Sequence, residues 1–137
     1  MTPDFIPNLQ NSYEAITRMV IDETFRHSLL QDTPKVQAVI RNIKDLDWLH
    51  KKCSEMFEVD KTAALKFMFH VFFEDTPYSI GNYDIYDSIA LYMDDSMNDE
   101  VCQYIQKRWA QQKNSMSTED KEIWLRECES WHCSLAR

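Results

Sequence analysis

Glycine is almost absent from this chain of 137 residues, which contains it only at Gly81. Average usage is about 7%. Phosphate-binding loops, dinucleotide-binding turns and nucleophile elbows need glycines where the backbone turns sharply or approaches a ligand. Tight hairpins between β-strands also depend on glycine. The composition therefore argues against nucleotide-binding α/β folds, hydrolases with a nucleophile elbow and multi-stranded β-proteins.

A long apolar run and an export signal are also lacking. No stretch of 18 or more apolar residues exists, which is the length that a membrane-spanning helix needs. The first residues, MTPDFIPNLQNSYEA, lack a basic region followed by an apolar stretch, so they do not resemble a secretion signal. We therefore expect a cytoplasmic protein without a membrane partner. Its cysteines, Cys53, Cys102, Cys128 and Cys133, are expected to be reduced thiols.

Apolar residues recur three and four positions apart along most of the chain, which predicts about six helices. Residues that favour helix N-termini mark their starts. The expected helices are 11–30, 34–56, 60–74, 84–93, 98–113 and 117–137, with N-caps at Asn11, Thr33, Asp60, Asn82 or Asp84, Asn98 and Ser117.

The helix expected over 60–74 differs from the others because its interior, AALKFMFHVFF, is apolar on nearly every side. A helix that is hydrophobic all round is a buried one. A chain of this length matches one domain and buries enough surface to be stable. We therefore predict a single all-α domain over 1–137, a compact bundle of about six helices around a buried central helix at 60–74.

Basic residues are missing from the middle of the chain, although the whole has 15 lysines and arginines against 23 acids and a net charge of −8. No lysine or arginine lies between Lys66 and Lys107. Five of the six tyrosines fall in that gap, together with eight acids, which equal the net excess. Those acids are Glu74, Asp75, Asp84, Asp87, Asp94, Asp95, Asp99 and Glu100.

Such a segment creates a local negative potential that repels nucleic-acid phosphates and anionic lipid and attracts basic protein surfaces. Tyrosine is enriched at the cores of protein interfaces. The segment is therefore a candidate docking face, and the alternative is a solvated acidic surface with inward-packed tyrosines. The predicted partner-binding residues are Asp75, Tyr78, Tyr83, Asp84, Tyr86, Asp87, Asp94, Asp95, Asp99 and Glu100.

These features favour a non-enzymatic module that inhibits or neutralises a protein with a basic, nucleic-acid-handling surface. Immunity proteins of nuclease toxins, phage anti-defence proteins and DNA mimics share its small size and acidity. Carboxylates of residues 84–100 would occupy the sites where phosphates bind, so no direct contact with nucleic acid is expected. A structural adaptor that forms oligomers, such as a homodimer, through an apolar helix face is an alternative.

Histidines and cysteines offer a weak pattern for a metal site. His50 and Cys53 lie three residues apart, and Cys128, His132 and Cys133 cluster near the C-terminus, which would suit zinc if the helices met. Cys53 also falls on an apolar stripe, where cysteine behaves as a small core residue. We expect no metal and no other cofactor, and we interpret His70 as a buried, hydrogen-bonded histidine.

A second alternative is enzymatic. Arg126 and His132 are separated by the five residues ECESW. This pattern resembles the Arg-x4–6-His motif of HEPN-family ribonucleases, which are all-helical, of similar length and carry the motif late in the chain. The resemblance covers seven residues, and Glu127 replaces the polar residue usual after the arginine. It implies cleavage of RNA across a dimer by Arg126 and His132, whereas the acidic charge opposes an RNA substrate.

Overall fold

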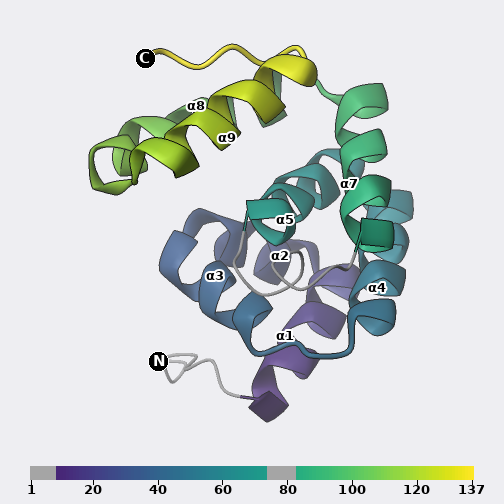
Figure 1. Cartoon of the computed structure of the whole chain (residues 1–137). Helices are drawn as coiled ribbons and strands as arrows, with labels where there is room; N and C mark the ends of the chain where they lie inside the picture. The colour runs from purple at the N-terminus through teal and green to yellow at the C-terminus, as the bar shows by residue number, and fades with distance from the viewer. Residues whose placement is uncertain (1–8, 74–82) are drawn as a thin grey trace.

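The computed structural model describes residues 9–73 and 83–137, with the side chains of 11–73 and 85–137. These ranges contain eight α-helices, one short 3-10 helix and no β-strand, which confirms the all-α class (Figure 1). The helices are α1 (Leu9–Ile21), α2 (Glu23–Gln31), α3 (Thr33–Arg41), α4 (Leu46–Val59), α5 (Lys61–Phe73), α7 (Tyr83–Ser96), α8 (Asp99–Gln112) and α9 (Thr118–Ser130), and the 3-10 helix η1 is Lys113–Ser115.

Two of the expected helices are each divided in two. The segment 11–30 breaks at Asp22, whose backbone is extended and whose side chain accepts a hydrogen bond from the Phe25 amide at 3.0 Å, opening α2. The segment 34–56 breaks before Asp45, which caps α4 through the Trp48 amide. In the segment between α3 and α4, the backbone amides of Lys44 and Asp45 donate hydrogen bonds to the hydroxyl of Tyr13. The apolar spacing continues through both breaks, so periodicity alone did not reveal them.

The expected N-caps were correct where a polar side chain directly precedes the first turn. Asp60, Asn98 and Ser117 each accept a hydrogen bond from the amide three residues ahead, at 3.1, 3.0 and 3.1 Å. The cap expected at Thr33 is instead Asp32, which accepts from the Lys35 amide and places Thr33 inside α3. Asn11 is not a cap either, because it lies inside α1.

The last helix does not continue to the C-terminus as expected. It ends at Ser130, and His132 follows with a φ of 64°. The amides of His132 and Cys133 donate to the carbonyls of Glu129 and Cys128, at 3.0 and 2.9 Å. This pairing is a Schellman motif with histidine at the left-handed position that glycine usually occupies. The chain therefore leaves the helix axis at this residue.

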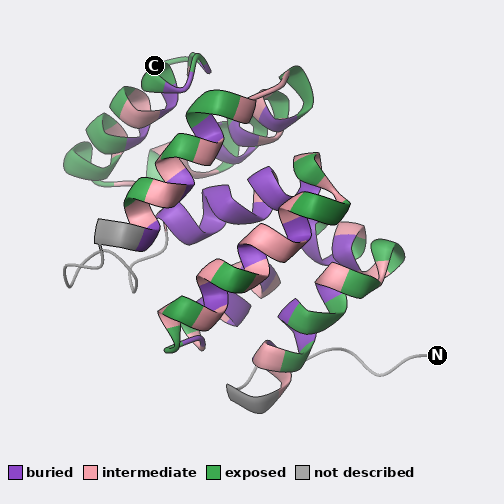
Figure 2. Ribbon diagram, turned by 90° about the vertical axis from the view of Figure 1, so that its right-hand side faces the viewer, coloured by how far each residue is buried: buried purple, intermediate pink, exposed green. Residues whose placement is uncertain are grey.

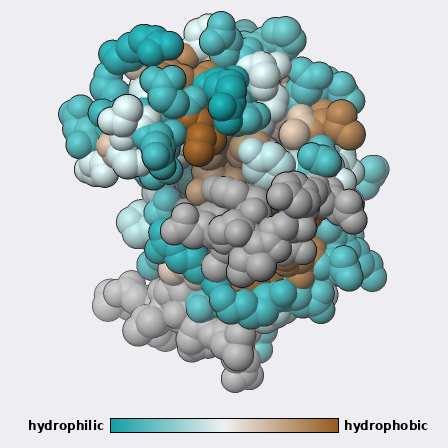
Figure 3. Space-filling view, in the orientation of Figure 1, coloured by the Kyte–Doolittle hydropathy of each residue, from teal (hydrophilic) through white to brown (hydrophobic). Residues whose placement is uncertain are grey.

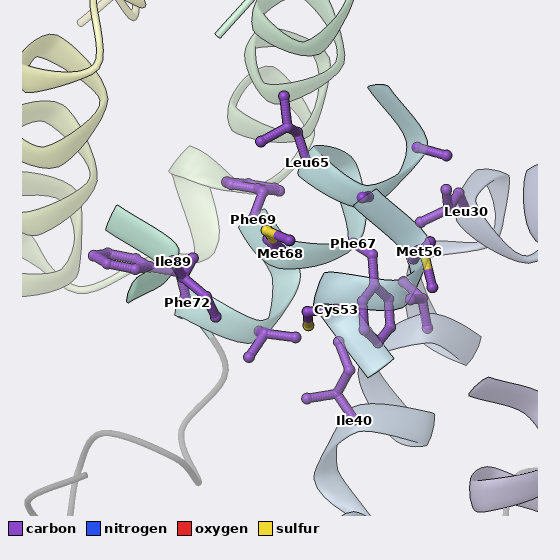
Figure 4. Packing of buried hydrophobic residues seen from close by; sticks show 14 of the residues in the cluster. Leu30, Ile40, Cys53, Met56, Leu65, Phe67, Met68, Phe69, Phe72 and Ile89 are labelled. Atoms are coloured by element: carbon purple, nitrogen blue, oxygen red, sulfur yellow. The ribbon is translucent and has the colours of Figure 1, made fainter. Parts of the chain in front are cut away.

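Helix α5 buries nine of its 13 residues and packs against α2, α3, α4, α7 and α8. It is the nearly all-purple ribbon in the middle of Figure 2. Figure 4 shows Leu30, Ile40, Met56 and Ile89, from four other helices, around it. A helix that is apolar on all sides is stable where neighbouring helices cover it, and α5 has contacts with five other helices.

The C-terminal helices α8 and α9 lie together above α5 in Figure 1. Aromatic rings join them to the rest of the core. Trp124 of α9 stacks on Phe73 with 4.6 Å between centroids, and Trp131 meets Phe72 edge-on at 4.8 Å. The tail after α9 is held on α8 by the disulfide Cys102–Cys133. Rings of this size supply much of the apolar area that a small domain buries.

The outer surface is mainly polar. In Figure 3, hydrophilic residues predominate outside the grey atoms, and hydrophobic residues reach the surface in separate areas. Within residues 9–73 and 83–137, no helix has the length and apolar character needed to span a bilayer.

Candidate functional site

Helix α7 carries most of the described part of the predicted docking segment. Ile85, Ile89 and Met93 are four residues apart and buried, so they form the face that packs on α5 and α4. The side of the helix opposite this face then points outward, because side chains three or four apart share one side of a helix. The outward side chains include Asp87, Leu91, Asp94 and Asp95, which are all exposed. We call these four residues the α7 face.

The acids of the α7 face are largely unneutralised. Asp87 and Asp95 make no ion pair with any side chain that the structure describes. The Asp94 carboxylate lies 3.9 Å from Nε2 of His132, which is a charged partner only when that histidine is protonated. No ion pair among the described side chains joins an arginine or lysine to this face, and Arg126 is the cation that acts on the neighbouring Tyr86.

Leu91 is the apolar centre of the α7 face, with 63% of its surface exposed. It lies on the border of two open grooves. The groove between α4 and α7 is lined by His50, Ser54, Phe57, Ser88, Leu91, Tyr92, Asp95 and Ser96. The groove between α7 and α9 is lined by Asp87, Ala90, Leu91, Asp94, Glu127, Ser130 and Trp131. An exposed leucine between two acid-lined grooves combines apolar contact with negative charge.

The tyrosines of this region pack against the protein itself. The ring of Tyr86 stacks on Phe72 with 4.0 Å between centroids, and burial together with the Glu127 carboxylate raises its pKa to about 12. Tyr92 packs on Phe57 at 4.8 Å. Both are only partly buried. Their main contribution is therefore to hold α7 against its neighbours, which is the inward packing that the alternative interpretation expected.

The remaining predicted docking residues lie elsewhere. Asp75 and Tyr78 are outside the described residues, and Tyr83 and Asp84 begin α7 with side chains that the structure does not describe. Asp99 and Glu100 are exposed in the first turn of α8, where the helix dipole favours acids. Of these two, Glu100 pairs with Lys66 at 3.7 Å. The acids at the start of α8 therefore follow the α7 face directly along the chain, but they are not part of it.

Leu91 and Glu127 were not predicted from the sequence. Leu91 lies outside the four-residue spacing of Ile85, Ile89 and Met93, so the sequence pattern could have indicated that its side chain is exposed. Glu127 comes from α9 and enters the groove only through the tertiary fold, so no local pattern indicated it.

A buried polar network lies on the opposite side of α5. His70 Nε2 and the Tyr104 hydroxyl are 2.6 Å apart, and that hydroxyl donates to the Leu30 carbonyl at 2.7 Å. Arg108 donates to the same carbonyl at 3.2 Å and lies over the Tyr104 ring. Burial and the nearby Arg108 charge lower the pKa of His70 to about 3. The interpretation of His70 as a buried, hydrogen-bonded histidine is confirmed.

The cysteines differ from the expectation. Cys102 and Cys133 form a disulfide, which contradicts the prediction that all four are reduced thiols. The Schellman turn brings Cys133 back to α8. The Cα atoms of Cys102 and Cys133 are 5.6 Å apart, which is within the usual range for a disulfide. Cys53 and Cys128 are free and buried, and burial raises the pKa of each thiol to about 12. Such thiols are poor nucleophiles and poor metal ligands.

The suggested zinc ligands do not come together. Among the residues that the structure describes, no group of three or more histidine, cysteine or acidic side chains could hold a metal ion. One of the suggested ligands, Cys133, is committed to the disulfide.

The residues of the ribonuclease-like motif, Arg126 and His132, lie in the last two turns of α9 and just after its C-terminal end. Arg126 is exposed on the helix, with its Nε 3.6 Å from the Glu127 carboxylate. His132 is beyond the helix end, and 84% of its side chain is exposed. Neither residue lines the hollow beside Trp124 or the groove between α7 and α9, as far as the described residues form them. RNA cleavage by this pair stays a prediction.

Comparisons of the chain with protein-family models, with curated proteins and with solved structures find no match.

Proposed function

We propose that this protein binds and neutralises a protein whose basic surface normally handles nucleic acid, and that the α7 face is the docking site. The observation that carries this proposal is an exposed Leu91 surrounded by Asp87, Asp94 and Asp95, with no described arginine or lysine to pair with them. In this proposal α5 is the central helix that holds α7 and α8 in place.

Charge and apolar contact have separate roles at such a site. Opposite charges about 4 Å apart attract by about 1 kcal/mol in bulk water and by about 4 kcal/mol near a protein surface. Three carboxylates therefore speed encounter and orient a basic partner. Leu91, between the two grooves, is the side chain that a partner buries, since energy in interfaces concentrates in a few well-packed side chains.

The spacing of the acids supports competition with nucleic acid. Asp87 and Asp94 are seven residues apart on one helix, which is about 10.5 Å along its axis. The two carboxylates therefore present negative charge along about two turns of one helix, and a basic surface that binds phosphates attracts such a row of charge.

Affinity capture with matched charge variants tests the proposal. The wild type should retain a basic protein from native lysate at about 0.05 M salt and release it at about 0.5 M. A triple variant, Asp87→Lys, Asp94→Lys and Asp95→Lys, should fail to retain it. The control changes three exposed acids on α1, α4 and α9 by the same total charge: Glu14→Lys, Asp47→Lys and Glu122→Lys.

Competition by added nucleic acid then shows whether the partner binds this protein through its nucleic-acid site or through some other basic surface. Double-stranded DNA or RNA added to the washed complex should release the retained protein, because both ligands would occupy one surface. Retention by the α7 variant equal to that by wild type, or a complex that neither polymer disturbs, contradicts the proposal.

The cytoplasmic localisation expected from the sequence is part of this proposal, and the disulfide bears on it. Disulfides persist mainly in oxidising compartments. Alkylation of thiols in intact cells, followed by mass analysis, tests the point. Alkylated Cys102 and Cys133 in the cytoplasmic fraction would support the localisation, and protein found only outside the cytoplasm would contradict it.

The adaptor alternative is favoured by one observation. Ile21 at the end of α1 and Val59 at the end of α4 are both exposed and line the same shallow groove. Paired exposed apolar side chains can be covered by a second copy of the chain. Sedimentation of wild type and of the variant Ile21→Glu, Val59→Glu tests this: a dimer that the variant abolishes supports the adaptor, and a monomeric wild type excludes it.

A further inference from the structure

A hollow separate from the α7 face lies between α3, α5, α9 and the end of α8. Its volume is about 230 Å³. Ligand-binding cavities usually enclose apolar walls and a few directed polar groups. This one combines three aromatic rings with two glutamine amides, a buried histidine and the charged side chains of Arg41 and Asp120.

The wall consists of Phe69 and Phe73 of α5 and Trp124 of α9. These rings fix one another, since Trp124 stacks on Phe73 and meets Phe69 edge-on at 5.2 Å. A wall of interlocked rings changes little when a ligand arrives, so its apolar surface is preformed. Flat apolar groups gain most from such contact.

His70 supplies a directed acceptor. It is 3% exposed and lines the hollow. The Tyr104 hydroxyl donates its only hydrogen to the Leu30 carbonyl, so it accepts the hydrogen bond from His70. Nε2 of His70 is therefore the protonated ring nitrogen. The other nitrogen, Nδ1, is then an acceptor, and it has no hydrogen-bond partner among the described residues. Arg108 and Lys66 both contact the Tyr104 ring, and Arg41 and Asp120 line the hollow together with His70.

We propose that this hollow binds a planar bicyclic heteroaromatic molecule, the size of indole or a purine base, whose N–H donates to Nδ1 of His70. An engineered apolar cavity of about 150 Å³ holds benzene, so about 230 Å³ suits a second fused ring. The amides of Gln37 and Gln112 line the same space and can bond the polar edge of a heterocycle. This site does not depend on the proposed docking function.

Two bicyclic probes of nearly equal shape test the hydrogen bond. Indole carries the N–H and indene does not. We expect indole to bind with a Kd of about 1 mM or below, and indene to bind about tenfold more weakly, because it leaves Nδ1 without a donor. Calorimetry gives both affinities. The ¹⁵N resonance of His70 Nδ1 should shift with indole and stay in place with indene.

Two variants locate the binding without changing the core. Gln112→Trp places a bulky ring in the hollow and should abolish indole binding. Gln103→Trp makes the same change on the exposed side of α8 and should leave the affinity unchanged. Adenine is the second probe, and binding of either indole or adenine that Gln112→Trp blocks supports the proposal. Absence of binding by both, equal affinity for indole and indene, or binding that survives Gln112→Trp would overturn it.

Discussion

Acidification should destabilise this protein through His70. Its pKa is about 3 in the folded chain, because burial and the Arg108 charge oppose protonation, and about 6.5 in an unfolded chain. Between these values the unfolded state binds a proton that the folded state does not. The free energy of unfolding contributed by this group is therefore present in full above about pH 6.5 and is lost as the pH falls toward 3.

The loss approaches about 1.4 kcal/mol per pH unit below pH 6.5. At about pH 4.5 it amounts to about 3 kcal/mol, a large part of the 5–15 kcal/mol that holds a typical domain together. His70→Gln removes the titrating ring and keeps an N–H that can reach the Tyr104 hydroxyl.

Urea unfolding followed by far-UV circular dichroism, at pH values between about 4 and 8, measures this contribution. The curves of unfolding free energy for wild type and His70→Gln should be parallel above pH 7. Below about pH 6.5 the wild-type curve should fall more steeply, by about 1.4 kcal/mol per unit. Curves that remain parallel down to about pH 4 would show that burial does not lower the pKa of His70 in the folded protein.

The disulfide, the cap of α8 and the left-handed residue after α9 each affect stability. Reduction of the Cys102–Cys133 bond, whose partners are 31 residues apart, should lower the unfolding free energy by about 4 kcal/mol in chemical denaturation, and an unchanged midpoint would contradict this. Asn98→Ala should cost about 1 kcal/mol in the same assay, because it removes the cap of α8, and a loss below a few tenths would contradict that role. His132→Gly should stabilise the fold by up to about 1 kcal/mol, because glycine adopts a positive φ without steric cost, and a lower melting temperature would count against it. If the ribonuclease alternative holds, wild type cleaves RNA and His132→Ala does not; inactive wild type excludes it.

Local signals allowed much of the fold to be predicted. The spacing of apolar residues identified the helical segments, and Asp60, Asn98 and Ser117 were correctly placed as caps because capping depends on side chains within three residues. The breaks at Asp22 and before Asp45 were missed, since the apolar stripe runs through them. In both places a local aspartate bond outweighs continuation of the helix.

The contacts between distant segments could not be predicted. Cys102 and Cys133 meet only because a left-handed turn at His132 reverses the chain, and the cysteine count does not indicate pairing. The buried network likewise joins α2, α5 and α8 through Tyr104, which the sequence offered only as part of an acidic, tyrosine-rich stretch. For the proposed docking site, the absence of basic residues indicated the segment that forms α7, whereas Glu127 of α9 reaches the groove only through the fold.

The dependence of partner binding on salt concentration shows whether the acids of the α7 face capture the partner. The affinity of the retained partner should be measured between about 0.05 and 0.5 M salt, for wild type, for the variant with lysine at positions 87, 94 and 95, and for the matched control. Capture by exposed carboxylates predicts that the logarithm of the affinity falls linearly with the logarithm of salt concentration for wild type and control. It also predicts a nearly flat, weak response for the α7 variant. A wild-type affinity that does not change over this range would contradict the claim.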